Sequence, residues 1–158
     1  MYERSNTCCF TGHRTVPAEE RSLVVERLVA HIRALYAEGY RRFITGGAIG
    51  FDTVAARALL VLKREYADLY FTMMIPCADQ DARWTDAQKA EYARHKAQAD
   101  EVIVLSDRYF DGCMQARNAA MVKESSAVIA YLTRPRSGTG QTVRLAERSG
   151  ARVFNLAE

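Results

Sequence analysis

A glycine-rich turn, Thr45-Gly46-Gly47-Ala48-Ile49-Gly50, is the segment whose residue types suggest chemistry most directly. Glycines let a backbone come close to an anion, and a helix expected from Phe51 onward would present unpaired N–H groups and its positive dipole end. This pattern is typical of a phosphate-binding turn. Because a helix dipole contributes only about 0.3–1 kcal/mol at a surface, charged side chains must also take part. An empty tight turn could have the same sequence, so the turn alone does not decide between the two.

A second polar cluster, Thr11-Gly12-His13-Arg14, follows a short apolar run and combines a hydroxyl, an imidazole and a guanidinium. Arginine can hold a phosphate through two parallel hydrogen bonds, and each charge-assisted bond contributes about 1.5–3 kcal/mol. We therefore count this cluster among the ligand-binding segments. The alternative is a solvated loop with Arg14 on the surface.

Two charged residues have both a structural and a ligand-binding interpretation. Arg117 shares a helical face with two methionines and therefore needs a partner, either a ligand phosphate or a carboxylate such as Asp100 or Asp107. Asp52 either caps the helix after the glycine turn or accepts hydrogen bonds from ribose hydroxyls. Both interpretations stay open for each residue.

A second turn, Ser137-Gly138-Thr139-Gly140-Gln141-Thr142, again combines small residues and hydroxyls at the expected start of a helix. Two such turns favour a shared anion site over chance glycines, although Ser137 is equally normal in an idle loop. Gln80, Trp84 and Tyr109 lie in other loops, where they could stack on or hydrogen-bond a base, or serve as core anchors.

Apolar periodicity places these segments between alternating strands and helices. Strands are expected at residues 6–10, 41–45, 68–75, 101–105, 127–132 and 152–154, and helices at 17–37, 51–62, 85–97, 114–123 and 141–149, with 134–140 as a loop. This alternation predicts an α/β fold, a single Rossmann-like domain over residues 1–158 with a mostly parallel sheet of about five to six strands and helices on both faces. All strand-to-helix loops then open at one edge of the sheet, where ligands bind.

Composition is that of an ordinary globular protein, with 158 residues, 49% hydrophobic and 26% charged. The apolar runs are no longer than strands and the first residues lack the apolar core of a signal peptide, so we expect a cytoplasmic protein without a membrane segment. The net charge of +3 is small and the basic residues are scattered, which gives no indication of a nucleic-acid partner.

The cysteines and histidines show no metal-type spacing, and no Ser-His-Asp set emerges. Cys8, Cys9, Cys77 and Cys113 are interpreted as buried free thiols, with Cys113 set apart as an exception. No metal is expected, and no catalytic residue is assigned.

The order of these motifs resembles the YpsA-like family of the SLOG superfamily, which also includes the DprA DNA-processing proteins and the LOG-type phosphoribohydrolases. The likeness covers essentially the whole chain. It rests on Cys9-Phe10-Thr11-Gly12-His13-Arg14, on Gly46-Gly47 with Gly50 and Asp52, on Ile75-Pro76 with Gln80 and Trp84, and on Tyr109, Met114, Arg117-Asn118, Met121 and Gly138-Thr139.

The resemblance implies a Rossmann-like domain that senses or processes nucleotide-derived ligands, with links to bacterial cell division and stress that would involve a protein partner. A homo-oligomer stays open. We expect a nucleotide, NAD or ADP-ribose-like ligand, and no further cofactor, at a site formed by Thr11, Gly12, His13, Arg14, Gly46, Gly47, Gly50, Asp52, Gln80, Trp84, Arg117, Asn118, Ser137, Gly138, Thr139, Gly140 and Thr142.

Three functions follow from this resemblance. The leading one is regulatory binding of a nucleotide-derived ligand without catalysis. The second is N-glycosidase action on nucleoside monophosphates, as in LOG-type enzymes, which pair a helix arginine with a PGGxGTxxE loop. Arg117 matches the arginine, but Thr142 stands in place of the glutamate, so a loop aspartate would have to replace it. The candidates are Asp79, Asp81, Asp107 and Asp111.

The third and weakest function is DprA-like binding of single-stranded DNA. Arg41, Arg42, Arg134 and Arg136 would supply the positive charge for it.

Overall fold

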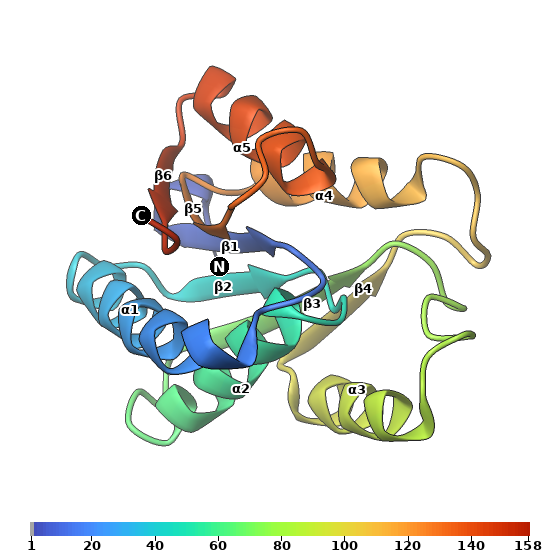
Figure 1. Ribbon diagram of the computed structural model, residues 1–158. Coiled ribbons are helices and arrows are strands. Elements are labelled where there is room, and N and C mark those ends of the chain that lie inside the picture. The colour runs from blue at the N-terminus through green and yellow to red at the C-terminus, as the bar shows by residue number, and fades with distance from the viewer. Residues whose placement is uncertain (1) are drawn as a thin grey trace.

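The computed structural model describes residues 2–158 as six strands and five helices that alternate along the chain, after a short 3₁₀ helix at Arg4–Asn6 (Figure 1). The strands are β1 (Thr7–Gly12), β2 (Arg42–Thr45), β3 (Tyr70–Ile75), β4 (Glu101–Val104), β5 (Ala127–Tyr131) and β6 (Arg152–Asn155). The helices are α1 (Ala18–Ala37), α2 (Phe51–Lys63), α3 (Asp86–Gln98), α4 (Cys113–Lys123) and α5 (Gly138–Arg148). None of the helices described within 2–158 has both the length and the apolar character needed to cross a membrane.

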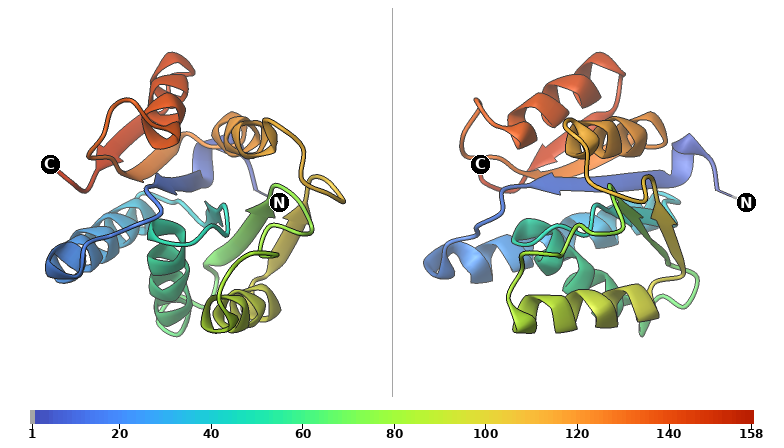
Figure 2. Two further views of the ribbon diagram at one scale, coloured as in Figure 1. Left: turned by 45° about the vertical axis from the view of Figure 1, so that its right-hand side comes forward. Right: turned by 90° about the vertical axis from the view of Figure 1, so that its right-hand side faces the viewer.

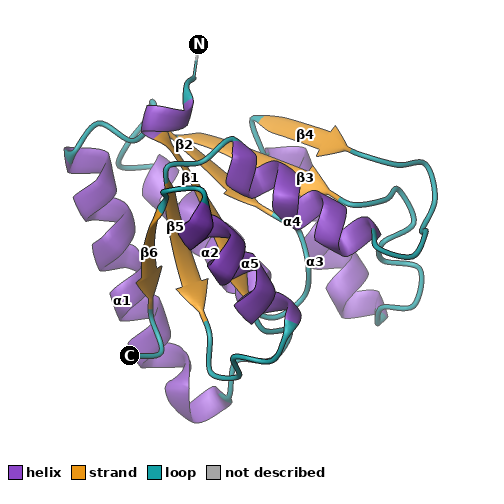
Figure 3. Cartoon of the chain, turned by 90° about the horizontal axis from the view of Figure 1, so that it is seen from above, coloured by secondary structure: helices purple, strands orange, loops and turns teal. Residues whose placement is uncertain are grey.

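The strands form one parallel sheet in the order β4-β3-β2-β1-β5-β6. The chain builds outward from β1 to β4 and then crosses back to β5, on the other side of β1. Helices α1, α2 and α3 therefore cover one face and α4 and α5 the other (Figures 1 and 2), and Figure 3 views the sheet from the α4–α5 side. The strand order reverses between β1 and β5, which is where ligands bind in open α/β sheets.

The two faces of the sheet bury separate apolar clusters because neighbouring side chains alternate along each strand. In β1, Cys8 and Phe10 pack into the larger cluster under α1 and α2, whereas Cys9 packs into the smaller one under α4 and α5. Burial raises the pKa of the Cys9 thiol to about 12, so this thiol stays neutral. All four cysteines are free and buried, which confirms the interpretation as buried thiols. Cys113, which the sequence set apart as an exception, is buried like the others.

The predicted order of strands and helices is confirmed, and the clearest boundary error lies at α5. The loop expected at 134–140 ends at Ser137, because the Ser137 hydroxyl accepts a hydrogen bond from the Gly140 N–H at 3.0 Å and starts the helix at Gly138. A good N-cap offsets the poor helix propensity of the glycines that follow.

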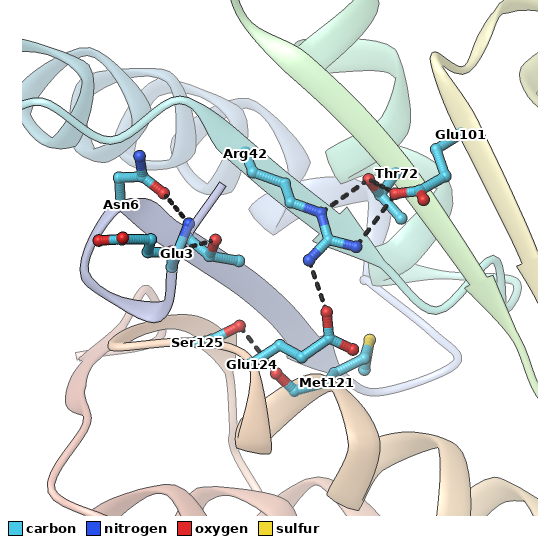
Figure 4. Close-up of polar contacts among 9 residues, drawn as sticks. Glu3, Asn6, Arg42, Thr72, Glu101, Met121, Glu124 and Ser125 are labelled. Atoms are coloured by element: carbon cyan, nitrogen blue, oxygen red, sulfur yellow. Dashed lines mark hydrogen bonds and ion pairs between the residues drawn. The ribbon is translucent and has the colours of Figure 1, made fainter. Parts of the chain in front are cut away.

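Arg42 ties three elements together at the edge of the sheet opposite the strand-to-helix loops (Figure 4). Its guanidinium donates to Thr72 on β3 at 3.2 Å, to Glu101 on β4 at 3.0 Å and to Glu124 at the end of α4 at 2.6 Å. Burial works to lower the pKa of Arg42, but the two carboxylates outweigh it and raise that pKa. Arg42 is therefore a structural residue that fixes the edge strand β4 and the C-terminus of α4.

Replacing Arg42 with methionine should destabilise the fold, because Glu101 and Glu124 would lose their partner. We expect the free energy of unfolding to fall by about 1.5–3 kcal/mol, measured by urea denaturation. The control is Arg33→Met, since Arg33 pairs with Glu65 on the surface and such pairs contribute at most about 1 kcal/mol. Equal losses for the two variants would contradict the assignment of Arg42.

Candidate functional site

Two adjoining cavities lie among the loops that follow the strands. The larger one, here called the β1–β5 cavity, has a volume of about 390 Å³ and is bounded by the loop after β1, by α4 and by the start of α5. The smaller one, the α2–α3 cavity, has a volume of about 280 Å³ and lies between the glycine turn, α2 and α3. The two cavities share Arg14, Thr15, Ala48 and Asp52.

The structure divides the predicted site residues between these cavities. The β1–β5 cavity is lined by Thr11, Gly12, His13, Arg14, Asp52, Gln80, Arg117, Asn118, Ser137, Gly138 and Thr139. The α2–α3 cavity is lined by Gly47, Gly50 and Trp84, with Arg14 and Asp52 again. Gly46, Gly140 and Thr142 line neither cavity, and the exposed Tyr109 also lies outside both.

The glycine turn is braced from inside by Asp52 and Arg117. One carboxylate oxygen of Asp52 accepts a hydrogen bond from the Ala48 N–H at 3.1 Å, and the Arg117 guanidinium donates to the Gly46 carbonyl. A Cβ atom at Gly46 would lie only 2.5 Å from Arg117 Nη1, so a larger residue there would force the guanidinium to shift. Part of the turn's hydrogen-bonding capacity is therefore used within the protein rather than left free for an anion.

Gly50 is required by the packing of two loops. Its φ of +83° is a conformation that favours glycine, and an added Cβ would collide with the backbone of Arg14. The Phe51 N–H, at the start of α2, donates to the His13 carbonyl at 3.0 Å. The loop after β1 and the glycine turn thus form one rigid unit between the two cavities.

Arg117 and Asp52 are oppositely charged residues buried in the same region. Burial lowers the pKa of Arg117, and the negative charge of Asp52 opposes this effect. Burial also raises the pKa of Asp52, against the influence of Arg117 and of the Ala48 N–H. Asp52 is therefore the carboxylate that compensates the buried charge of Arg117. Asp100, one of the two carboxylates suggested from the sequence, pairs instead with Lys63 at 2.6 Å.

His13 positions the loop between β5 and α5. Its Nε2 accepts hydrogen bonds from the backbone N–H groups of Thr133 at 2.9 Å and Arg134 at 3.2 Å, so the proton of the neutral ring resides on Nδ1. Burial, and secondarily the charge of Arg134, lower the pKa of His13 below its ordinary value of 6.5. Neutral His13 thereby holds Arg134 at the rim of the β1–β5 cavity.

Arg14 and Arg134 are the two cations available at this cavity. Both side chains are exposed, both line the cavity, and neither guanidinium has a hydrogen-bond or ion-pair partner within residues 2–158. The first turn of α5, at Gly138 and Thr139, lines the same cavity, and Gly138 has open space beside its backbone. Positive charge and a helix N-terminus therefore face one space.

Gln80 connects the two cavities and has an unused acceptor. Its Nε2 donates to the Gly47 carbonyl and to the Tyr92 hydroxyl, each at 3.2 Å. Its Oε1 is buried without a hydrogen-bond partner in the described part of the chain. A ligand hydroxyl at the β1–β5 cavity would supply the missing donor.

Sequence reasoning missed most of the polar wall of the α2–α3 cavity, which contains Arg57, Glu91 and His95. The spacing of Glu91 and His95 places them on one face of a helix and was a usable signal. The approach of Arg57 depends on how α2 packs against α3 and has no local signature.

Together, the fold and the loops define a Rossmann-like α/β domain whose candidate site lies where the strand order reverses. A family model named YpsA and described as the YspA SLOG family matches residues 9–146, and the chain belongs to this family.

Relatives in sequence agree with this assignment. The chain is 30% identical over 137 residues to the uncharacterised SPbeta prophage-derived protein YoqJ of Bacillus subtilis, which covers 78% of this chain and 80% of that protein. It is also 26% identical over 111 residues to the UPF0398 protein YpsA of Bacillus subtilis, with 69% of this chain and 59% of that protein covered.

Solved structures of DNA processing protein A have the same fold. The Helicobacter pylori protein, described for its unique single-stranded DNA binding mode, gives a TM-score of 0.68 at 20% identity and covers 96% of this chain and 65% of its own. The Streptococcus pneumoniae protein gives a TM-score of 0.67 at 20% identity and covers 94% of this chain and 49% of its own.

The lowered pKa of His13 predicts a pH-dependent stability. The folded state binds fewer protons than the unfolded state, so stability present above about pH 6.5 should decline as the pH falls through the folded-state pKa. Glutamine can accept the same N–H groups without titrating, so His13→Gln should show a smaller loss of unfolding free energy between about pH 7.5 and about pH 5.5. Urea unfolding at the two pH values measures this loss. The same loss in both proteins would show that His13 does not contribute.

Proposed function

We propose that this chain binds a nucleotide-derived ligand in a regulatory role, with a ligand phosphate in the β1–β5 cavity. The observation that carries the proposal is the pair of unpartnered guanidinium groups, Arg14 and Arg134, which line the same cavity as the first turn of α5. The one carboxylate lining that cavity is Asp52, which is already engaged with Ala48 and electrostatically compensated by Arg117. A phosphate would therefore meet positive charge without a competing free carboxylate.

The cavity also offers groups suited to a sugar. The unpartnered Gln80 Oε1 can accept a hydrogen bond from a hydroxyl, and the side chains of Asn118 and Ser137 line the same space. A ribose phosphate combines an anion with hydroxyl donors, and it is the part that a nucleotide, NAD and ADP-ribose have in common. These groups support the nucleotide-derived class without choosing among its members.

The arrangement favours binding over cleavage of the N-glycosidic bond. Thr142, at the position of the LOG-type glutamate, donates its hydroxyl to the Gly138 carbonyl at 2.9 Å and lines neither cavity described above. The loop aspartates considered as replacements, Asp79, Asp81, Asp107 and Asp111, also do not line these cavities. We therefore propose that the protein is a sensor that acts through a protein partner. The partner is proposed from the family resemblance.

The arginines suggested for single-stranded DNA binding do not form one surface. Arg42 is buried between Glu101 and Glu124, and Arg41 donates to Asp68 and to the Tyr36 carbonyl. These two residues lie at the start of β2, at the opposite edge of the sheet from Arg134. Charge alone therefore gives DNA binding less support than binding of a small ligand.

Removing either free guanidinium should weaken binding of ADP-ribose. We expect Arg14→Ala and Arg134→Ala each to raise the Kd by about 10-fold to 100-fold, since a charge-assisted hydrogen bond contributes about 1.5–3 kcal/mol. The matched control is Arg136→Ala, which removes an exposed arginine from the same loop that does not line the cavity. Calorimetric titration measures the three Kd values. Unchanged Kd values for Arg14→Ala and Arg134→Ala would refute the phosphate site.

Incubation of the wild-type protein with AMP and with ADP-ribose separates sensing from catalysis. We expect both compounds to be recovered intact by chromatography, because no free carboxylate lines the β1–β5 cavity. Accumulation of free adenine that Arg117→Ala abolishes would instead establish the N-glycosidase alternative.

A further inference from the structure

The α2–α3 cavity is not needed to bind a phosphate, yet it adjoins the β1–β5 cavity along a shared wall. Arg14, Thr15, Ala48 and Asp52 line both spaces, and Gln80 bonds to Gly47 and to Tyr92 on the far side. The two spaces are therefore immediate neighbours on either side of these four residues.

One wall of the α2–α3 cavity is aromatic and apolar. The half-buried indole of Trp84 packs edge-on with Tyr92, with ring centroids 4.9 Å apart and planes at 62°. Met73 and Val54 add apolar surface to the same lining. An aromatic wall of this kind is suited to a flat ring, because stacking buries apolar area and tolerates many heterocycles.

The lining of the α2–α3 cavity also includes polar side chains that are held in place by contacts with one another. Arg57 donates two hydrogen bonds to Glu91, at 2.5 and 2.7 Å, and His95 Nε2 lies 3.2 Å from the same carboxylate. Burial lowers the pKa of His95, so the ring is neutral and has one N–H donor and one acceptor nitrogen. Fixed polar groups in the same cavity as an aromatic surface match a ring with heteroatoms at its edge, not a plain hydrocarbon ring.

We propose that the α2–α3 cavity is a nucleobase subsite, in which the base of the ligand stacks on Trp84 while its phosphate lies between Arg14 and Arg134 in the β1–β5 cavity. This inference rests on the proposed function, since it assigns the part of the ligand that the phosphate site does not hold. It names the ligand class as a nucleotide with an intact base, which distinguishes it from a bare sugar phosphate.

A comparison of AMP with ribose 5-phosphate tests the subsite, because the two probes differ only by the base. We expect wild-type protein to bind AMP about 10-fold more tightly or better, as stacking of one base on an aromatic side chain typically provides. Trp84→Leu should abolish this preference and leave the Kd of ribose 5-phosphate unchanged. Arg134→Ala should instead raise the Kd values of both probes by the same factor.

Trp84→Phe is the control for a purely structural effect of the Trp84→Leu substitution. Phenylalanine keeps an aromatic face, so this variant should retain part of the preference for AMP. Thermal unfolding of each variant without ligand shows whether it is folded. If Trp84→Leu weakens both probes equally, or weakens neither, the subsite is wrong while the phosphate site stands on the Arg134→Ala result. If neither probe binds the wild-type protein but ADP-ribose does, the subsite is wrong and the proposed function stands. If none of the three compounds binds, both fail.

Discussion

Arg117 reaches from α4, on one face of the sheet, to the glycine turn that leads into α2 on the other face. Its guanidinium donates to the Gly46 carbonyl, while Asp52, from the first turn of α2, holds the Ala48 N–H at 3.1 Å. Each charge is buried, and each would be costly without the opposite charge nearby. The shape of both cavities depends on this arrangement, because the turn it fixes is the wall between them.

The titratable side chains near the site fall into two groups with different roles. One group hydrogen-bonds to backbone atoms and holds the loops in place: Arg117, Asp52 and neutral His13. Arg14 and Arg134 have no protein partner in the described chain and line the cavity that those loops enclose. Rigid loops that carry unpartnered charges are preorganised, which reduces the ordering that a ligand must otherwise impose.

Much of the fold could be predicted from the sequence, because apolar strands and periodic helices depend on local patterns. The reversal of strand order between β1 and β5 depends on long-range pairing, and no local pattern encodes it. The motifs located the site region, but hydrogen bonding decided their roles. Gly46 contacts a guanidinium from a residue 71 positions away, and Gly50 is required by the backbone of Arg14. The cavity wall of Arg57 and Glu91 depends on a contact between two helices, 34 residues apart in sequence.

The most direct test of this account is a crystal structure of the protein grown with AMP. We expect the phosphate to lie within hydrogen-bond distance of both the Arg14 and Arg134 guanidinium groups, at the first turn of α5, with the base against Trp84. A phosphate bound elsewhere, out of reach of Arg14 and Arg134, would contradict this placement.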